Sequence, residues 1–150
     1  MKNTEGAILI QILLQIMRGS DSCNSFFESL LNRVKQRSQQ APLSNLLKKH
    51  ILGVYLSALI YNKSATLMYF EQNGMTAQLL QELVNSQKKM KHNYERRMFI
   101  VGLSELLQNE ILPESLRPQL LAIINAIIDS LMSMIKEEQK EAKRKAKAEM

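Results

Sequence analysis

The chain contains one cysteine, two histidines, three prolines, five glycines and no tryptophan among its 150 residues. The single cysteine, Cys23, excludes an internal disulfide framework, and a reducing compartment is its natural setting. Cys23, His50 and His92 are too far apart in sequence to match the short spacings of zinc ligands. The sequence has no recognisable pair of nucleophile and base, no paired acids and no glycine-rich phosphate loop. These absences favour a non-enzymatic protein that uses neither a metal nor another cofactor.

Helix-forming residues make up most of what is present. Leu, Ile, Met, Gln, Lys and Ala dominate the composition, and hydrophobic residues account for 45% of the chain. These residue types favour helices, and no segment has the alternating pattern of a strand. A domain of this size buries roughly 70% of the surface that its unfolded chain exposes, which is enough for a sizeable core. We therefore predict an all-α fold.

An apolar run at residues 8–17 invites comparison with a signal peptide. Gln11 and Gln15 interrupt it, Glu5 precedes it, and no small-residue cleavage site follows. No stretch reaches the roughly 18 consecutive apolar residues that a membrane span requires. We therefore expect a soluble intracellular chain with no membrane partner.

Apolar residues recur with helical periodicity in about seven segments. The predicted helices cover residues 5–18, 25–35, 44–61, 65–71, 76–86, 94–108 and 115–135. Residues 36–43 are polar and contain Pro42, so we predict a loop there. Gly19 and the pair Asn73-Gly74 are predicted stops, because glycine accommodates the left-handed conformation that often follows a helix.

Three residues with side-chain oxygens are predicted to begin helices. Ser25 and Glu28 have the spacing of a capping box, in which the serine accepts from a first-turn amide and the glutamate accepts from the serine's own amide. Asn93 and Ser115 are the predicted N-caps of the last two helices. Each cap would satisfy backbone donors that a helix leaves unpaired in its first turn.

Each predicted helix has an apolar face for burial. In the third helix the residues predicted to face inward are Leu46, Leu47, Ile51, Val54, Tyr55, Leu59 and Ile60. In the last helix they are Leu116, Leu120, Ile123, Ile124, Ile127, Ile128, Leu131 and Ile135. Apolar residues cover most of the circumference of the sixth helix, so we expect it to lie between two neighbours. These residues are Met98, Phe99, Ile100, Val101, Leu103, Leu106 and Leu107.

Apolar doublets begin at Phe26, Leu79 and Leu120, at intervals of 53 and 41 residues. The intervals are loosely compatible with the antiparallel helix pairs of about 40–47 residues that HEAT and armadillo proteins repeat. An ordinary orthogonal bundle would give the same apolar stripes. We predict that residues 1–135 form a HEAT/armadillo-like helical solenoid segment of about seven antiparallel helices. Residues 136–150, with six basic and four acidic side chains, are predicted to form a charged, frayed helical tail.

The net charge of +6 permits acidic partners without requiring nucleic acid. The candidate partner-binding residues form one basic cluster, which comprises Lys88, Lys89, Lys91, Arg96 and Arg97. This cluster could meet an acidic protein surface, or it could simply be the charged connection between two helices. Nucleic-acid modules combine basic residues with stacking aromatic ones. Tyr94 stands alone here, so we do not expect direct nucleic-acid binding.

Two segments resemble the importin-beta (karyopherin) superfamily. The first, at residues 54–74, reads VYLSALIYNKSATLMYFEQNG, in which one helix ends in Tyr61-Asn62 and a short helix follows. The second, at residues 94–107, reads YERRMFIVGLSELL. Its matching positions are Glu95, Arg96, Arg97, Gly102 and Leu103. The order and spacing are most similar to the C-terminal region of the importin seven and importin eight group, over about residues 45–135.

The resemblance implies a non-enzymatic scaffold within a nuclear transport receptor, which binds protein cargo and carries it through the nuclear pore under Ran-GTP control. It implies shuttling between cytoplasm and nucleus, and contact with Ran-GTP only through parts of a longer chain that this sequence does not include. Two features depart from the family's pattern. Lys63 stands where the family usually has proline, and the tail is mixed in charge where the family is often strongly acidic.

Two other functions are compatible with the same residues. One is a freestanding helical adaptor or assembly scaffold, and the other is a small nucleic-acid-associated helical domain. A longer reading frame with further helical pairs upstream would favour the receptor. Salt-sensitive nucleic-acid binding, lost when the basic cluster is changed to glutamate, would favour the nucleic-acid domain. A segment cut from a solenoid exposes a bare apolar end, so self-association is also expected.

Overall fold

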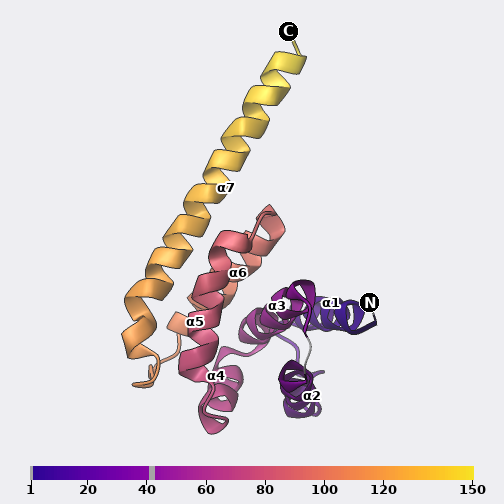
Figure 1. The fold of residues 1–150 in the computed structure, drawn as a ribbon, viewed down its shortest axis with the longest axis vertical. Coiled ribbons are helices and arrows are strands. Elements are labelled where there is room, and N and C mark those ends of the chain that lie inside the picture. Colours follow the sequence, from indigo (N-terminus) through magenta and orange to yellow (C-terminus); the bar gives the residue numbers. More distant parts are fainter. Residues whose placement is uncertain (1, 41–42) are drawn as a thin grey trace.

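The protein is described by a computed structural model that covers residues 2–40 and 43–150. Within these ranges the backbone forms helices, turns and loops without a strand, which confirms the all-α prediction. The α helices are α1 (Lys2–Ile16), α2 (Phe27–Gln39), α3 (Asn45–Tyr61), α4 (Lys63–Gln72), α5 (Thr76–Ser86), α6 (Asn93–Leu107) and α7 (Leu120–Ala148) (Figure 1). Two 3-10 turns, η1 (Gln87–Lys89) and η2 (Arg117–Gln119), precede α6 and α7.

Helix α3 lies at the centre of the fold. It packs against α1 and α6 and also contacts α2 and α4. Its sequence is apolar around most of the circumference, as expected for a helix that is buried on several sides. Leu56, Ala58 and Leu59 are accordingly inaccessible to solvent. Leu46, which was predicted to face inward, is exposed, because Leu47 occupies the inward position in the first turn.

Helix α1 runs along α3 in the same direction. The Gln11 side chain contacts His50, and further along both helices the Gln15 side chain contacts Ser57. The partners are 39 and 42 residues apart in sequence. Because the later residue of α1 contacts the later residue of α3, the two helices run parallel and side by side, as neighbours in one row.

Helix α6 lies on the other side of α3 and also runs in its direction. Lys49 pairs with Glu95, and further along Leu56 meets Gly102. A Cβ atom on Gly102 would lie 3.0 to 3.2 Å from side-chain and backbone atoms of Leu56, so glycine permits this close approach. Helix α6 packs against α7 as well as α3, which confirms that it lies between two neighbours.

Helices α2 and α4 are related in the same way. The Tyr69 hydroxyl donates to Asn32 Oδ1 at 2.7 Å, and the Lys35 ammonium donates to Asn73 Oδ1 at 2.9 Å. These partners are 37 and 38 residues apart. Again the later residue of one helix contacts the later residue of the other, so α2 and α4 run in the same direction. The chain therefore has a row formed by α1, α3 and α6, and a second set of parallel contacts between α2 and α4.

Several predicted helix boundaries are confirmed. Gly19 and Gly74 have φ angles of +78° and +62°, the left-handed conformation expected at helix ends. The Asn62 side chain accepts from the backbone N–H of Ala65 at 3.0 Å and so caps α4. Asn62 is thus the single residue between the end of α3 and the start of α4.

The predicted start of α2 is wrong. The helix begins at Phe27, and its N-cap residue Phe26 makes no side-chain capping bond. The Phe26 N–H donates instead to the carbonyl of Cys23, which holds Ser25 in a turn above the buried Cys23. Helix α2 continues to Gln39, so residues 36–39 are helical rather than part of the predicted loop. Pro42 lies outside the described residues.

The two later N-caps are also misplaced. Helix α6 starts at Asn93 with His92 as its N-cap, and the Glu95 carboxylate accepts from the His92 N–H at 3.5 Å. Ser115 does not cap α7, because its hydroxyl donates to Glu71 and η2 intervenes before the helix. At α6 the local cap is displaced by one residue, to His92, whereas at Ser115 a tertiary contact with Glu71 takes the place of the local cap.

Helix α7 is the longest element, and its C-terminal half extends away from the other helices (Figure 1). The predicted continuous buried stripe is wrong, because neighbouring elements in the described part of the chain cover only the side of α7 that carries Ile123, Ala126 and Ser130 and leave the other side uncovered. Ile124, Ile128, Leu131 and Ile135 are exposed. The helix continues through the charged tail to Ala148.

The segment Arg117–Ala148 is also apolar enough, by length and composition, to cross a membrane, and only 17% of its most apolar window is buried. Sequence analysis expected no such candidate. Asn125 and Asp129 interrupt the apolar residues, so the segment is not an unbroken apolar run.

Candidate binding groove

A groove of about 670 Å³ lies over α3, between α1 and α6. Its lining combines apolar side chains with amides, one imidazole and two guanidinium groups. The lining residues are Ile8, Gln11, Ile12, Gln15 and Arg18 from the α1 region, His50 and Ile60 from α3, and Tyr94, Arg97, Met98 and Val101 from α6. Pockets that are mainly apolar with a few directed polar groups are the usual form of a binding site.

The floor of the groove depends on a glycine in α3. Gln11 is buried, and its Nε2 donates to the His50 carbonyl at 2.9 Å. A Cβ atom on Gly53 would lie 2.6 to 2.9 Å from the Gln11 amide. Glycine at position 53 therefore lets the amide lie directly on the α3 backbone, where it is hydrogen bonded rather than unpaired.

A second glutamine joins all three helices of the row. Gln15 Nε2 donates to Ser57 Oγ at 3.1 Å and lies 3.3 Å from Met98 Sδ. Ser57 belongs to α3 and is buried, whereas Met98 belongs to α6. Gln15 thus positions the Met98 side chain over the floor of the groove.

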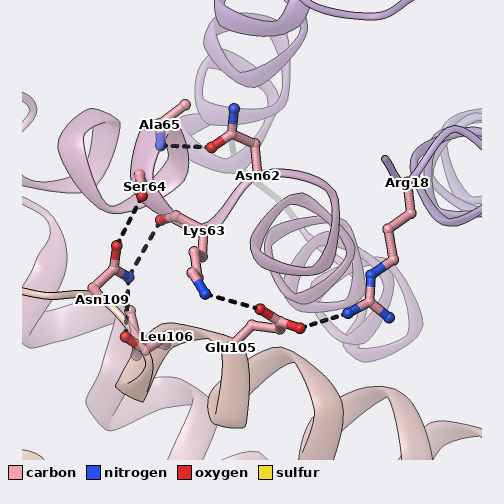
Figure 2. Close-up of polar contacts among 8 residues, drawn as sticks. All are labelled: Arg18, Asn62, Lys63, Ser64, Ala65, Glu105, Leu106 and Asn109. Atoms are coloured by element: carbon pink, nitrogen blue, oxygen red, sulfur yellow. Dashed lines mark hydrogen bonds and ion pairs between the residues drawn. The ribbon is translucent and has the colours of Figure 1, made fainter. Parts of the chain in front are cut away.

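The C-terminal end of α1 is tied to α6 by an ion pair. Arg18 Nη2 lies 2.5 Å from Glu105 Oε1, and Lys63 Nζ lies 3.6 Å from Glu105 Oε2. Figure 2 shows the Glu105 carboxylate between these two cations. Lys63, the residue that departs from the importin pattern, therefore has its own partner on α6. The paired charges fix one end of the groove, although Arg18 and Lys63 are exposed enough that neither pair has a large effect on stability.

Asn109 adds a second link beside this ion pair. Its Oδ1 accepts from the Ser64 hydroxyl at 3.2 Å, and its Nδ2 donates to the Leu106 carbonyl at 3.0 Å (Figure 2). The side chain thereby joins the end of α6 to the start of α4. The α3–α4 junction is held to α6 by side chains on both sides.

The other end of the α3–α6 contact contains a buried carboxylate. Glu95 is 4% exposed, pairs with Lys49, and accepts from the backbone N–H of Lys91 at 3.1 Å. Burial alone would raise the pKa of Glu95. The hydrogen bond and charge of Lys49, together with the N–H groups of His92 and Lys91, outweigh burial and leave the pKa below its ordinary value.

His50 lies between this ion pair and the groove. Burial, and then the positive charge of Lys49, lower the pKa of His50, against an opposing effect of Glu95. His50 Nδ1 is 3.3 Å from Gln11 Nε2. The groove therefore favours the neutral imidazole, and its cationic groups are Arg18, which is paired with Glu105, and Arg97.

The predicted basic cluster does not form one surface around the groove. Of its five residues, only Arg97 lines the groove. Arg96 donates to Asn93 Oδ1 at 3.0 Å within the first turn of α6. The other three are exposed on the connection between α5 and α6, and they are Lys88, Lys89 and Lys91.

Sequence reasoning missed most residues of the groove. Gln11 and Gln15 had been considered only as polar interruptions of an apolar run. Their spacing of four residues was a usable signal, because it places two amides on one face of a helix. Ile8 and Ile12 flank the same face. No sequence signal indicated that this face would lie opposite α6.

The described residues contain no group of three or more His, Cys, Asp or Glu side chains that could hold a metal ion. No family model matches the sequence, and neither curated proteins nor solved structures gave a match. The fold and the groove together define an all-helical protein with an apolar, amide-bearing and cationic surface groove. This arrangement suits non-covalent recognition of an amphipathic ligand.

Proposed function

We propose that this chain is a segment of a HEAT-type helical solenoid that acts as a protein-binding scaffold, with the groove over α3 as its binding site. The observation that carries the proposal is the groove itself, which joins three helices from distant parts of the sequence. Its chemistry is that of recognition, because apolar side chains line it and polar groups stand at its edges.

The repeated spacing of contacts supports the solenoid architecture. Side-chain partners in neighbouring helices lie 37 to 42 residues apart between α1 and α3 and between α2 and α4. The α3–α6 partners Lys49 and Glu95 are 46 residues apart. These offsets lie within or just below the roughly 40–47 residues of a HEAT or armadillo unit. In such an architecture equivalent helices of successive units run in the same direction, side by side.

The groove favours an amphipathic protein segment that carries an acidic residue. Ile8, Ile12 and Val101 offer apolar contact to one face of a helix. Arg97 stands at the rim on α6, is exposed, and can form a forked pair with a carboxylate. Apolar anchors at the centre with a charged rim are the usual division of roles in protein recognition.

The test compares proteins captured by the immobilised chain from a cell extract. We expect Ile12→Asp with Val101→Asp to lose specific proteins that the unchanged chain captures. The matched control Lys88→Glu with Lys89→Glu alters charge on the α5–α6 connection and should retain them. Capture that survives the groove changes but is lost in the control would contradict the groove and favour the basic connection.

We further propose, on the resemblance alone, that the scaffold belongs to a nuclear transport receptor. The motif residues occupy positions at which the helices begin or meet. Asn62 caps α4, Glu95 anchors the start of α6, and Gly102 allows α6 to approach α3. Ran-GTP should release groove-bound proteins from the whole gene product. Capture that is indifferent to Ran-GTP in that protein would contradict the transport role and leave the scaffold role standing.

A further inference from the structure

Helix α7 carries an exposed apolar stripe that the groove does not use. Its residues are separated alternately by three and four positions, and they are Leu121, Ile124, Ile128, Leu131 and Ile135. Their exposed fractions range from 39% to 70%. Met132, at 53%, widens the stripe. A continuous apolar surface of this kind marks an interaction site.

The stripe faces away from the body of the protein. Ile123, Ala126 and Ser130 are the buried residues of α7. Residues in an α helix are separated by roughly 100° around the axis. Ile124 and Ile128 therefore lie on a different side of α7 from the buried set. A partner can cover the stripe without displacing α6.

The spacing of the stripe indicates what kind of partner fits. Alternation of three and four residues is the seam of a two-stranded coiled coil, where each apolar side chain enters a space between residues of the facing helix. The best complement is another long helix with the same alternation. Helix α7 of a second copy meets this requirement, and two-fold symmetry makes one surface serve both partners.

The charges of α7 select the orientation of this pairing. The tail is mixed in charge, but its segment 143–147 is purely basic, with Lys143, Arg144, Lys145 and Lys147 all exposed. Lys145 Nζ also lies 3.2 Å from Glu141 Oε1 within the same helix. A parallel pair would bring the two tails together, and like charges would repel. An antiparallel pair brings each tail to the partner's opposite end, where Glu110 and Glu114 are exposed on the loop before α7. Two-fold symmetry then gives each dimer two contacts between a basic tail and an acidic loop.

We propose that two copies of this chain associate through antiparallel pairing of their α7 helices. The apolar seam is formed by residues 124–135 of each copy, and the tail of each copy lies against the acidic loop of the other. In this register Ile124 faces Ile135 of the other copy, and Ile128 faces its Leu131. The groove lies on α1, α3 and α6, so the dimer leaves the groove open. The dimer proposal is therefore independent of the proposed function of the groove.

The first test measures the molar mass of the full chain by light scattering over a wide range of concentration. We expect a monomer–dimer equilibrium. Ile128→Lys should abolish the dimer, whereas Asp129→Lys, an exposed neighbour outside the seam, should retain it. Circular dichroism should show both variants folded, because neither residue is buried. A chain that stays monomeric throughout, or a dimer that survives Ile128→Lys, overturns the proposal.

Charge reversal tests the role of the tail. Glu110→Lys with Glu114→Lys should weaken dimerisation by several-fold, and adding Lys145→Glu with Lys147→Glu should restore it. Failure of the second pair to rescue the first would remove the acidic loop from the interface. Weaker dimerisation at higher salt would agree with the proposed contact.

Engineered cysteines test the orientation. Ile124→Cys with Ile135→Cys should form a disulfide-linked dimer under oxidising conditions, whereas Ile124→Cys alone should not. Efficient cross-linking by the single variant would indicate parallel pairing and contradict the model. Vesicles of anionic phospholipid provide the remaining comparison. A monomer that binds these vesicles through the Ile128 stripe would assign α7 to a membrane surface and overturn the dimer.

Discussion

Helices α3 and α7 are both apolar around much of their circumference, yet their surroundings differ. In α3, ten of 17 residues are buried, because α1 and α6 cover opposite sides. In α7, three of 29 residues are buried. Packing covers one side of α7 and leaves the side of Ile128 open. The comparison shows that an apolar pattern predicts the capacity for burial, while the number of neighbouring helices determines how much burial occurs.

The largest expected effect contrasts the same substitution in the two helices. Leu56→Ala in α3 should lower the free energy of unfolding by about 2–5 kcal/mol, because it opens a cavity where no solvent reaches. Leu131→Ala in α7, where the side chain is exposed, should lower it by less than about 0.5 kcal/mol in dilute solution. Urea unfolding measures both values. Equal losses would break the comparison, and a Leu131 effect that grows with concentration would belong to self-association.

An intermediate effect is expected at the ion pair between α3 and α6. Lys49→Met should lower the free energy of unfolding by about 1–3 kcal/mol, since it leaves the buried Glu95 carboxylate without its cation while the backbone N–H bonds remain. Lys48→Met, at the exposed neighbouring position, is the matched control and should have little effect. Chemical denaturation separates the two. A larger loss in the control would contradict the role assigned to Lys49.

Two glycines test how closely the helices of the row approach. Gly102→Ala should destabilise by about 1–2 kcal/mol, because the new methyl group meets Leu56 and the gain in helix propensity offsets only part of the strain. Gly6→Ala in α1 meets no atom within 4 Å and should stabilise by about 0.5–1 kcal/mol. Thermal melts give the two signs. Stabilisation by Gly102→Ala would show that α3 and α6 can separate at little cost.

The smallest effect concerns pH. The pKa of His50 is lowered from 6.5 by burial and Lys49, so its contribution to stability is complete above pH 6.5 and is lost as pH falls through the folded pKa. Glu95, lowered from 4.5, keeps its contribution until pH falls below 4.5 and toward its folded pKa. Urea unfolding across pH should therefore show two declines. His50→Gln should remove only the first, and the exposed His92→Gln should retain it.

Helix content and several boundaries could be predicted because they depend on local chemistry. Gly74 reverses the chain wherever its neighbours lie, and the Asn62 region interrupts the helical pattern with a side chain that caps the next turn. Ser25 and Ser115 failed as predicted caps for different reasons. At Ser25 a competing local turn, in which the Phe26 N–H donates to the Cys23 carbonyl, replaces the cap. The bond from Ser115 to Glu71 joins residues 44 positions apart, and a local pattern does not contain it.

The candidate site was less predictable than the helices. Its parts come from α1, α3 and α6, and the contacts between them join residues about 40 positions apart. Arg97 could be found from sequence as a basic residue, but its separation from Lys88 and Lys89 could not. That separation arises because Arg97 lies on α6 beside the groove, whereas Lys88 and Lys89 lie in η1 before the helix.

The sequence by itself determined an all-helical chain, because residue propensities, glycine stops and apolar periodicity act within a few residues. It also determined that α3, α6 and α7 have apolar surfaces large enough to require partners. Tertiary structure alone decided which of these surfaces are covered, since burial depends on the approach of a second helix. It decided for the same reason that Gln11, Met98 and Arg97 share one groove while Ile128 faces solvent.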